Sequence, residues 1–357
     1  MFSFFESTRK QLEDELTVQG YSSVHAKNIF RHIYKHRAPS LESLEGLPQK
    51  FKEQLSASLS SGPGLVLESA SELLSHYDQS VKFLWTLADG QKVESVLMPE
   101  KTRITLCVST QVGCRQACVF CSTGRMGLLR NLKSSEILAQ LWSAALWIRS
   151  HPEWLQNVKL SPTQTISNIV FMGMGEPLDN TEELLKAIAV FIDPFGLAMA
   201  PKRVTVSTAG HLDGLKELYQ ANLGVSLALS LHSTRSEERS RLMPINKRYP
   251  LEDILSFLRD SRWTEDKPVM IQYTLMAGVN DGETDAEELC KLLSGLQAKV
   301  NLIPLNSVEG GRLKAPHPDK IRAFSAITRR AGLQTTVRYS KGQDILAACG
   351  QLLVKKS

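Results

Sequence analysis

Hydrophobic and polar positions from about residue 100 onward alternate between a strand period and a helix period. Runs rich in β-branched residues, typical of buried strands, occupy residues 103–109, 167–173, 203–210, 224–233, 268–276, 298–306 and 333–340. Amphipathic helical patterns lie between most of them, as over residues 134–148, where Ser134 or Ser135 is the expected N-cap. This alternation predicts βαβ units and a parallel sheet. With about six such units, we expect a partial (β/α)6-type barrel in an α/β protein.

The chain before residue 100 has a different pattern. Residues 1 to about 60 have helical periodicity, with Phe30, Ile33 and Tyr34 at helical spacing. The basic residues of the same stretch are Lys27, Arg31, Lys35 and Arg37. They form either a solvated helix face or a surface that contacts phosphates.

Residues 81–100 contain two β-rich runs around Asp89-Gly90, which predicts a β-hairpin. We therefore expect a small helical N-terminal domain and a β-hairpin before the barrel. The expected division is an accessory domain over residues 1–93, which recognises the substrate, and a core over residues 94–357.

Composition narrows the class of protein only slightly. The 357 residues are 42% hydrophobic, an ordinary value for a globular chain. No run of about eighteen apolar residues is present, and the first residues become charged too early for a secretory signal, so we expect a cytoplasmic protein without a membrane span. The formal net charge of +5 permits a polyanionic partner without requiring one.

The cysteines carry the most specific chemical information. Cys114, Cys118 and Cys121 form a C-x3-C-x2-C motif. Zinc sites usually offer four ligands in paired short spacings, so a structural zinc site here needs a distant histidine. Three thiolates close together fit a [4Fe–4S] cluster that leaves one iron open. Phe120 before the last cysteine and the segment Met172 to Pro177 make the motif resemble the radical S-adenosylmethionine superfamily.

A longer series of segments indicates a narrower family. The stretches "CVSTQVGC", "CSTGRMGLLRNL", "NIVFMGMGEPLDN", "LMPINKRYPLEDIL" and "GQDILAACGQL" follow one another along the chain. They resemble the RlmN/Cfr family of radical S-adenosylmethionine RNA methyltransferases, and the RlmN branch more than the Cfr branch. Members of that branch methylate C2 of an adenosine in 23S ribosomal RNA. The resemblance runs from about residue 20 to 353 and is dense from residue 94 onward.

The resemblance implies a role for each reactive side chain. Cys349 takes a methyl group from one S-adenosylmethionine molecule, and a second molecule supplies the radical that activates the methylcysteine. Glu94 removes the proton of the adenine carbon. Cys107 then releases the product by forming a transient disulfide with Cys349. Two S-adenosylmethionine molecules are therefore expected per turnover.

The resemblance also implies cofactor contacts and partners. The expected contacts with S-adenosylmethionine are Gly175, Glu176, Ser207, Ser230, Leu231, His232 and Asn306. The expected partners are 23S ribosomal RNA, transfer RNA as a further substrate, and an electron donor such as a flavodoxin-type protein. We expect a monomer.

The N-terminal helix departs from the family pattern. His25, Asn28 and His32 stand where the family usually has Arg, Gln and Trp. This leaves open a paralogue that acts on another RNA site or carbon, such as C8 of adenine. A non-enzymatic iron–sulfur regulator is a third reading, and turnover of the cofactor by the purified protein would exclude it.

Overall fold

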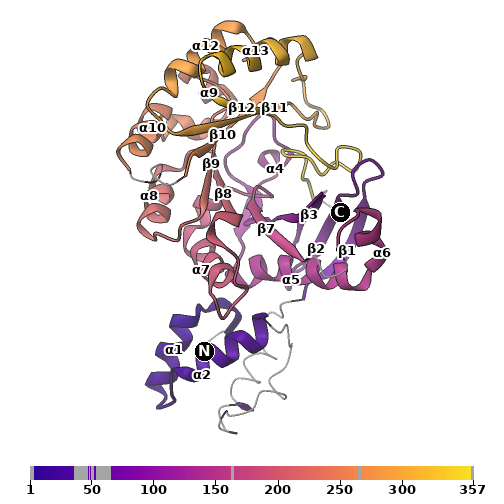
Figure 1. Ribbon diagram of the computed structural model, residues 1–357, viewed down its shortest axis with the longest axis vertical. Coiled ribbons are helices and arrows are strands. Elements are labelled where there is room, and N and C mark those ends of the chain that lie inside the picture. The colour runs from indigo at the N-terminus through magenta and orange to yellow at the C-terminus, as the bar shows by residue number, and fades with distance from the viewer. Residues whose placement is uncertain are drawn as a thin grey trace.

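A ten-stranded sheet dominates the computed structural model (Figure 1), in the order β1-β2-β3-β4-β7-β8-β9-β10-β11-β12. The structure describes residues 4–35, 47, 49, 52–53, 66–161, 165–261, 263 and 267–354. A second, two-stranded sheet pairs β5 (Gln111–Cys114) with β6 (Gly127–Asn131). Sequence periodicity did not predict this small sheet.

All neighbouring strands from β4 to β12 pair in parallel. These strands are β4 (Arg103–Cys107), β7 (Ile166–Phe171), β8 (Val204–Thr208), β9 (Ser226–Ser230), β10 (Val269–Leu275), β11 (Ala298–Pro304) and β12 (Gln334–Val337). Each corresponds to one of the seven predicted runs. The sheet has two edges, β1 and β12, so the expected partial barrel is confirmed.

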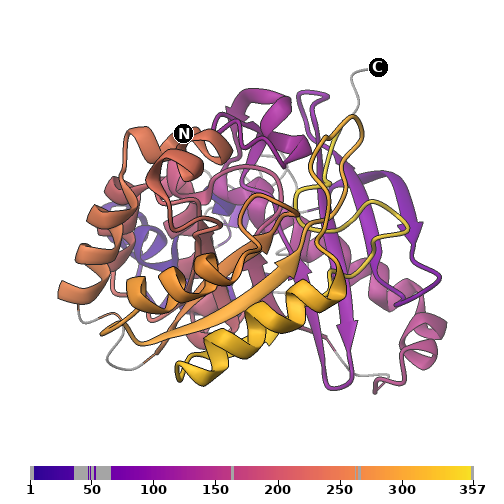
Figure 2. The same ribbon diagram turned by 90° about the horizontal axis from the view of Figure 1, so that it is seen from above.

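Helices connect the parallel strands and lie on the outside of the curved sheet (Figure 2). They are α5 (Ser134–Ser150), α6 (Pro152–Asn157), α7 (Thr181–Ile192), α8 (Leu212–Gln220), α9 (Ser236–Leu242), α10 (Leu251–Asp260), α12 (Glu283–Leu292) and α13 (Pro318–Arg330). The predicted N-cap of α5 is wrong, because Lys133 is the N-cap and both serines are already helical. Glu136 accepts a hydrogen bond from the Lys133 N–H (2.9 Å), so this helix start needs no serine hydroxyl.

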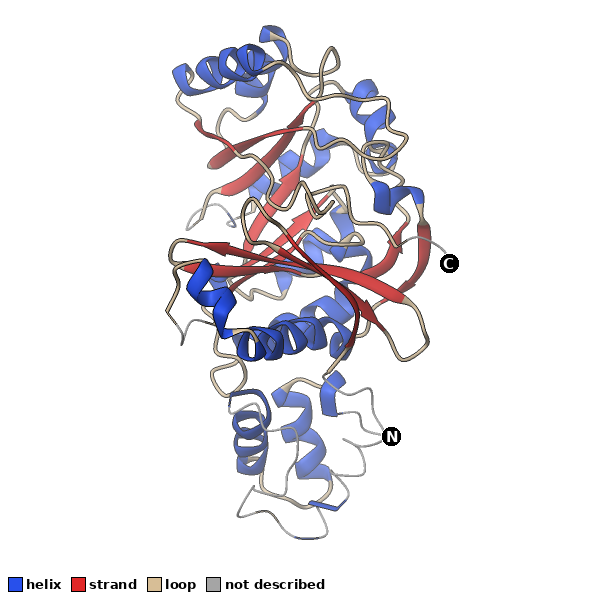
Figure 3. Ribbon diagram, turned by 90° about the vertical axis from the view of Figure 1, so that its right-hand side faces the viewer, coloured by secondary structure: helices blue, strands red, loops and turns tan. Residues whose placement is uncertain are grey.

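The predicted hairpin is confirmed as β2 (Val81–Thr86) and β3 (Lys92–Glu100), which pair antiparallel. β1 (Glu68–Leu74) pairs with β2, and β3 pairs with β4, so these strands extend the barrel sheet. Figure 3 shows them crossing the middle of the molecule, above the N-terminal helices. The sheet thus runs across residue 93, and the division into two domains there stays a prediction.

The N-terminal helices α1 (Arg9–Val18) and α2 (Val24–Phe30) pack on each other below the barrel (Figure 1). α2 continues as one π-helical turn, Arg31–Lys35. Phe30, Ile33 and Tyr34 are buried, as their spacing predicts. The rest of the helical stretch expected up to residue 60 lies almost entirely outside the described residues.

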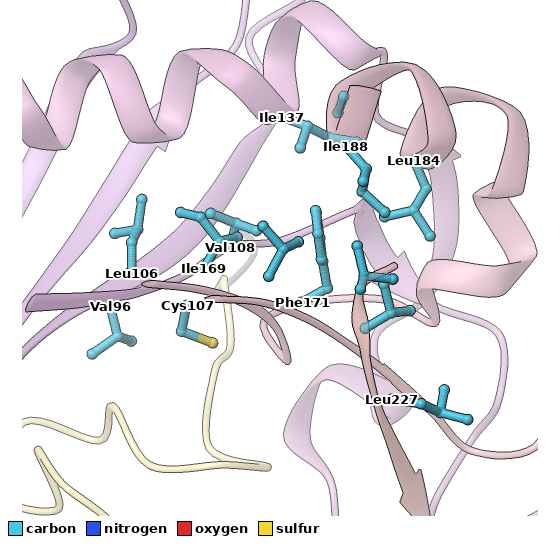
Figure 4. Close-up of a cluster of buried hydrophobic side chains, with 14 of the residues drawn as sticks. Val96, Leu106, Cys107, Val108, Ile137, Ile169, Phe171, Leu184, Ile188 and Leu227 are labelled. Atoms are coloured by element: carbon cyan, nitrogen blue, oxygen red, sulfur yellow. The ribbon is translucent and has the colours of Figure 1, made fainter. Parts of the chain in front are cut away.

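The buried core fills the space between the sheet and its helices, and it explains where Cys107 points. Leu106 and Val108 face the helical layer in Figure 4, whereas the Cys107 sulfur lies on the other side of the strand. Successive side chains of a strand point to opposite faces, so one strand contributes both core and site residues. Cys107 therefore faces the inside of the barrel.

Candidate active site

The three-cysteine loop joins β5 to the short helix α4 (Ser122–Arg125). Its side chains alternate in exposure, with Arg115, Ala117 and Val119 exposed. Cys114 is buried, while Cys118 and Cys121 are partly buried. Burial is the main cause that raises the pKa of all three thiols, that of Cys114 to about 12. The loop therefore directs its thiols inward, into surroundings in which burial outweighs the charge of Arg239 near Cys118.

A cavity lies between this loop and the carboxyl ends of the parallel strands. All three cysteines line it, together with Phe120. The residues that line its other walls include Gly175, Glu176, Ser207, Ser230, His232, Gln272, Asn306 and Cys349. Barrel enzymes place their sites at this end of the strands. Six of the seven expected cofactor contacts thus line the cavity, and Leu231 does not.

The Gly175-Glu176 turn after β7 fixes a buried carboxylate in the cavity wall. Gly175 has a φ of +102°, and a Cβ there would lie 2.6 Å from the Cβ of Gln111, so only glycine fits. The Glu176 carboxylate accepts hydrogen bonds from the N–H groups of Ala209 (2.7 Å) and Leu178 (3.1 Å). Burial raises the pKa of Glu176 to about 7. This acid can accept a hydrogen bond from a cationic amino group.

His232 is held in a strained conformation at the end of β9. Its φ is +58°, a region that residues other than glycine rarely adopt. Its Nδ1 accepts a hydrogen bond from the Thr274 N–H (3.0 Å), and its ring packs edge-on against Phe120 at 5.1 Å. Burial, with the charge of Arg239, lowers the pKa of His232 to about 3, so it is neutral. The neutral ring leaves Nε2 as a hydrogen-bond donor.

Leu231 is fully buried and does not line the cavity. Its N–H donates to the Gln272 carbonyl (3.0 Å), and its carbonyl accepts from Arg239 Nε (3.0 Å). Both of its backbone groups are therefore occupied. A contact between Leu231 and a cofactor stays a prediction.

Arg239 is a site residue that the sequence reading missed. Its guanidinium is fully buried and donates to the carbonyls of Ala209 (2.7 Å) and Ser230 (3.1 Å), as well as to Leu231. Burial lowers its pKa to about 10. Arg239 thus ties the ends of β8 and β9 together and places a positive charge behind the cysteine loop. In the sequence it stands in the charged stretch "RSEERSR", which resembles an exposed helix face.

A second polar group anchors the cysteine loop from outside. Asp179 accepts a hydrogen bond from the Gln116 side chain (2.5 Å) and lies 3.3 Å from His211 Nε2. Arg115 lies 3.7 Å from the same carboxylate. The loop between Cys114 and Cys118 is therefore held by side chains as well as by its backbone. In the sequence, the only sign of this role is that Asp179 stands two residues after Pro177, the end of the Met172–Pro177 segment.

The C-terminal segment brings Cys349 to the cysteine loop. The Ser122 N–H donates to the Gly350 carbonyl (2.7 Å), and Asn306 Nδ2 donates to the Cys349 carbonyl (3.1 Å). Gly350 has a φ of +82°, and a Cβ there would lie 3.1 Å from the Phe120 carbonyl. Asn306, expected as a cofactor contact, thus also positions the cysteine.

Cys349 joins two cavities. It lines the cavity of the three cysteines, and it also lines a second cavity with Cys107. Arg338 and Lys341 line this second cavity too. Both thiols are free, with Cys349 exposed and Cys107 buried. Burial is the main cause that raises the pKa of Cys107, and the nearby Cys349 adds to it.

Glu94, the expected proton acceptor, is buried beside the C-terminal segment and lines neither of these cavities. Its Oε1 lies 3.1 Å from Lys82 Nζ, and its Oε2 accepts from the Leu353 N–H (2.8 Å). Burial raises the pKa of Glu94, although the Lys82 charge opposes this. Leu353 is four residues from Cys349, so Glu94 is coupled to the segment that carries the cysteine.

The side chains present fit an iron–sulfur cluster better than a single metal ion. Within the described ranges, no three His, Cys, Asp or Glu side chains are grouped so that they could hold one ion. A cubane cluster takes each thiolate on a different iron, so it does not require the thiols to meet at one point. Cys114, Cys118 and Cys121 would hold it, and Glu176 and His232 would contact the cofactor beside it.

Comparisons with known proteins identify the class to which this fold and site belong. Residues 108–292 match the profile of the radical SAM superfamily. The crystal structure of a radical SAM methyltransferase from Sphaerobacter thermophilus superposes with a TM-score of 0.86, at 37% identity over 99% of both chains. The chain is therefore a radical SAM protein, which confirms the expected fold and implies a [4Fe–4S] cluster and S-adenosylmethionine.

Curated relatives narrow the family. The dual-specificity RNA methyltransferase RlmN of Campylobacter lari is 41% identical over 93% of both chains. The probable RlmN of Moorella thermoacetica is 40% identical over 96% of this chain and 94% of its own. This chain belongs to the RlmN family of radical SAM methyltransferases, as its motifs predict. In the described part of the chain, no helix is long and apolar enough to cross a bilayer.

Proposed function

We propose that this enzyme methylates C2 of an adenosine in 23S ribosomal RNA, and also in transfer RNA, through a methylcysteine at Cys349. The observation that carries the proposal is the position of Cys349, which lines both the cavity of the cluster cysteines and the cavity of Cys107. A methyl carrier needs access to the methyl donor on one side and to the substrate on the other. The curated relatives are named dual-specificity RNA methyltransferases, which supports two RNA substrates.

In the proposed reaction, Cys349 carries the methyl group and Glu94 accepts a proton. The Cys349 sulfur attacks the methyl group of one S-adenosylmethionine and loses its proton. The cluster and a second S-adenosylmethionine, when bound, supply a radical that removes one hydrogen from that methyl group. The carbon radical then bonds to C2 of adenine, and Glu94 accepts the C2 proton, while the adduct would give up one electron to a one-electron acceptor such as the bound cluster. Two molecules of S-adenosylmethionine are therefore consumed per turnover.

Release of the product requires the second cysteine. The Cys107 sulfur attacks the Cys349 sulfur, and the electron pair of the sulfur–carbon bond moves to carbon, which takes up a proton. A methyl group stays on adenine, and a disulfide joins the two cysteines. The shared cavity supports this step, because both cysteines line it. The disulfide must be reduced before the next turnover.

Glu94 needs a conformational change to act as the base. Both of its oxygens have partners, Lys82 and the Leu353 N–H, and neither cavity includes it. Withdrawal of the C-terminal segment would free Oε2 and open a path from Glu94 toward Cys107. The same withdrawal would move Cys349 away from the cluster loop. We infer that a single withdrawal of the C-terminal segment both frees Glu94 to act as the base and moves Cys349 toward the substrate.

Mass spectrometry of nucleosides tests the proposal. Ribosomal and transfer RNA from cells that lack the gene should lose 2-methyladenosine, and the wild-type gene should restore it. The Cys349→Ala gene should restore nothing, although its protein is made. Loss of 8-methyladenosine instead would show that the enzyme acts at C8, and unchanged nucleosides would refute the proposal. Action as a monomer in the cytoplasm stays a prediction.

A further inference from the structure

A shallow surface hollow lies against the outer side of the cysteine loop. Its lining includes Val119, a residue that is 42% exposed although it stands between Cys118 and Cys121 in the chain. The hollow is lined by Val119, Arg125, Glu238, Arg241, Leu242, Val279, Gly310, Arg312 and Leu313. It shares no lining residue with either cavity of the active site. The loop therefore separates the hollow from the reactive cysteines.

The hollow is held firmly to the loop. The Val119 N–H donates to the Leu242 carbonyl at the end of α9 (3.1 Å). The Val119 carbonyl accepts from the Arg125 guanidinium (3.4 Å), which also donates to the Glu309 carbonyl (2.8 Å). Both backbone groups of Val119 are thus occupied. A partner that docks here meets a fixed surface on the loop that carries the thiols.

The charge of the hollow is strongly positive. Three guanidinium groups line it, those of Arg125, Arg241 and Arg312, against one carboxylate. That carboxylate, Glu238, lies 3.1 Å from Arg241. Arg312 is exposed, and no ion pair to it is found among the described residues. Clustered charge of one sign attracts a partner of the other sign and speeds its association.

We propose that this hollow is the docking site of the electron donor, an acidic one-electron carrier protein that delivers its electron through the Val119 backbone. The inference rests on the radical chemistry of the proposed function, in which the cluster must be reduced by one electron while the carrier is oxidised by one. Electron transfer slows steeply with distance, and Val119 directly follows Cys118 in the chain, so this face offers a short path to the cluster. RNA is also anionic, but its adenine must reach Cys349, on the other side of the loop.

Charge reversal in the hollow tests the proposal. The double variant Arg241→Glu, Arg312→Glu keeps Arg125, which holds the loop backbone. With reduced flavodoxin as the probe, its cluster should be reduced roughly ten-fold more slowly at low ionic strength, and flavodoxin should bind more weakly. Salt should slow the wild type more than the variant. Excess dithionite, a small reductant, should support normal cleavage of S-adenosylmethionine in both proteins.

Arg203→Glu is the matched control, because Arg203 is exposed at the opposite end of the barrel, just before β8. It should leave the flavodoxin rate unchanged. Equal slowing by both variants, or no slowing by the double variant, would overturn the proposal. So would a loss of RNA affinity in the double variant with its flavodoxin rate unchanged, which would assign the hollow to RNA. These cleavage assays contain no RNA, so their result is independent of the RNA target.

Discussion

At the scale of single residues, the protonation state of each site side chain depends on the residues that bury it. Glu176, His232 and Glu94 have shifted pKa values because all three side chains are buried. The motifs in the sequence predicted all three residues, but not their state. Arg239 shows the limit of sequence reasoning, since its neighbours are charged and only the fold reveals that it is buried. Burial of a charged side chain depends on contacts that are distant in the chain.

Glu94 and Lys82 give a prediction about pH. A base acts when ionised, and the raised pKa of Glu94 means that product formation falls as pH drops through this pKa. Lys82→Met removes the ammonium that opposes the shift, so the acid limb of the pH profile should move to higher pH. Glu94→Gln should lower product formation roughly 10²–10⁴-fold above this pKa, and by less below it, where Glu94 of the wild type is protonated.

The matched control is Lys101→Met, which removes an exposed ammonium from the turn between β3 and β4. Its pH profile should coincide with that of the wild type. A Lys82→Met profile with an unmoved acid limb would show that Glu94 is not the base.

At the scale of elements, periodicity predicted the seven parallel strands and the hairpin, because buried strands need apolar runs. It missed β1, whose sequence "ESASELL" is polar and largely exposed, and the short pair β5–β6. These elements are fixed by pairing with neighbours rather than by their own pattern. The position of the C-terminal segment was also not predicted from periodicity. Side-chain hydrogen bonds hold this segment, which has no regular secondary structure.

Substitution of Gln351 tests how the C-terminal segment positions Cys349. Its Nε2 donates to the Ser307 carbonyl (2.7 Å), and its Oε1 accepts from the Ala348 N–H (3.2 Å). Gln351→Leu keeps the volume but leaves two backbone groups unpaired, which costs about 1–3 kcal/mol. Methylation of Cys349, followed by the mass of the intact protein, should slow about ten-fold.

The iron content of Gln351→Leu should stay normal, because the two side-chain partners of Gln351, Ser307 and Ala348, lie outside the cysteine loop. Gln19→Leu removes an exposed amide from the end of α1 and serves as control. An unchanged methylation rate in Gln351→Leu would mean that the segment is positioned by other contacts.

The basic helix α2 tests RNA binding. Lys27 and Arg31 are exposed beside the Phe195 ring, at 5.8 and 5.1 Å from its centroid. If both contact phosphates, reversal to Glu should flatten the dependence of log affinity on log salt by roughly 0.7–0.9 per contact. Lys10→Glu, an exposed change on α1, is the control. A slope unchanged by reversal at both positions would make this helix a solvated face.

At the scale of the whole molecule, the fold brings together residues from opposite ends of the chain. β4 ends at Cys107, the C-terminal segment carries Cys349, and Cys349 shares one cavity with Cys107 and another with Cys114, Cys118 and Cys121. No sequence spacing could predict that Cys349 lines two cavities. The proposed reaction therefore depends on the division of roles between Cys107 and Cys349.

A denaturing gel of the protein with RNA, S-adenosylmethionine and a reductant tests that division most directly. The Cys107→Ala variant can be methylated at Cys349 and can bond to adenine, but it cannot release the methylated RNA. It should therefore give a slowly migrating band of covalent protein–RNA complex. Cys349→Ala, the double variant and the cluster-free Cys118→Ala should give none. A band for Cys349→Ala alone would mean that the two roles are exchanged. Normal methylated RNA from both single variants would contradict the account.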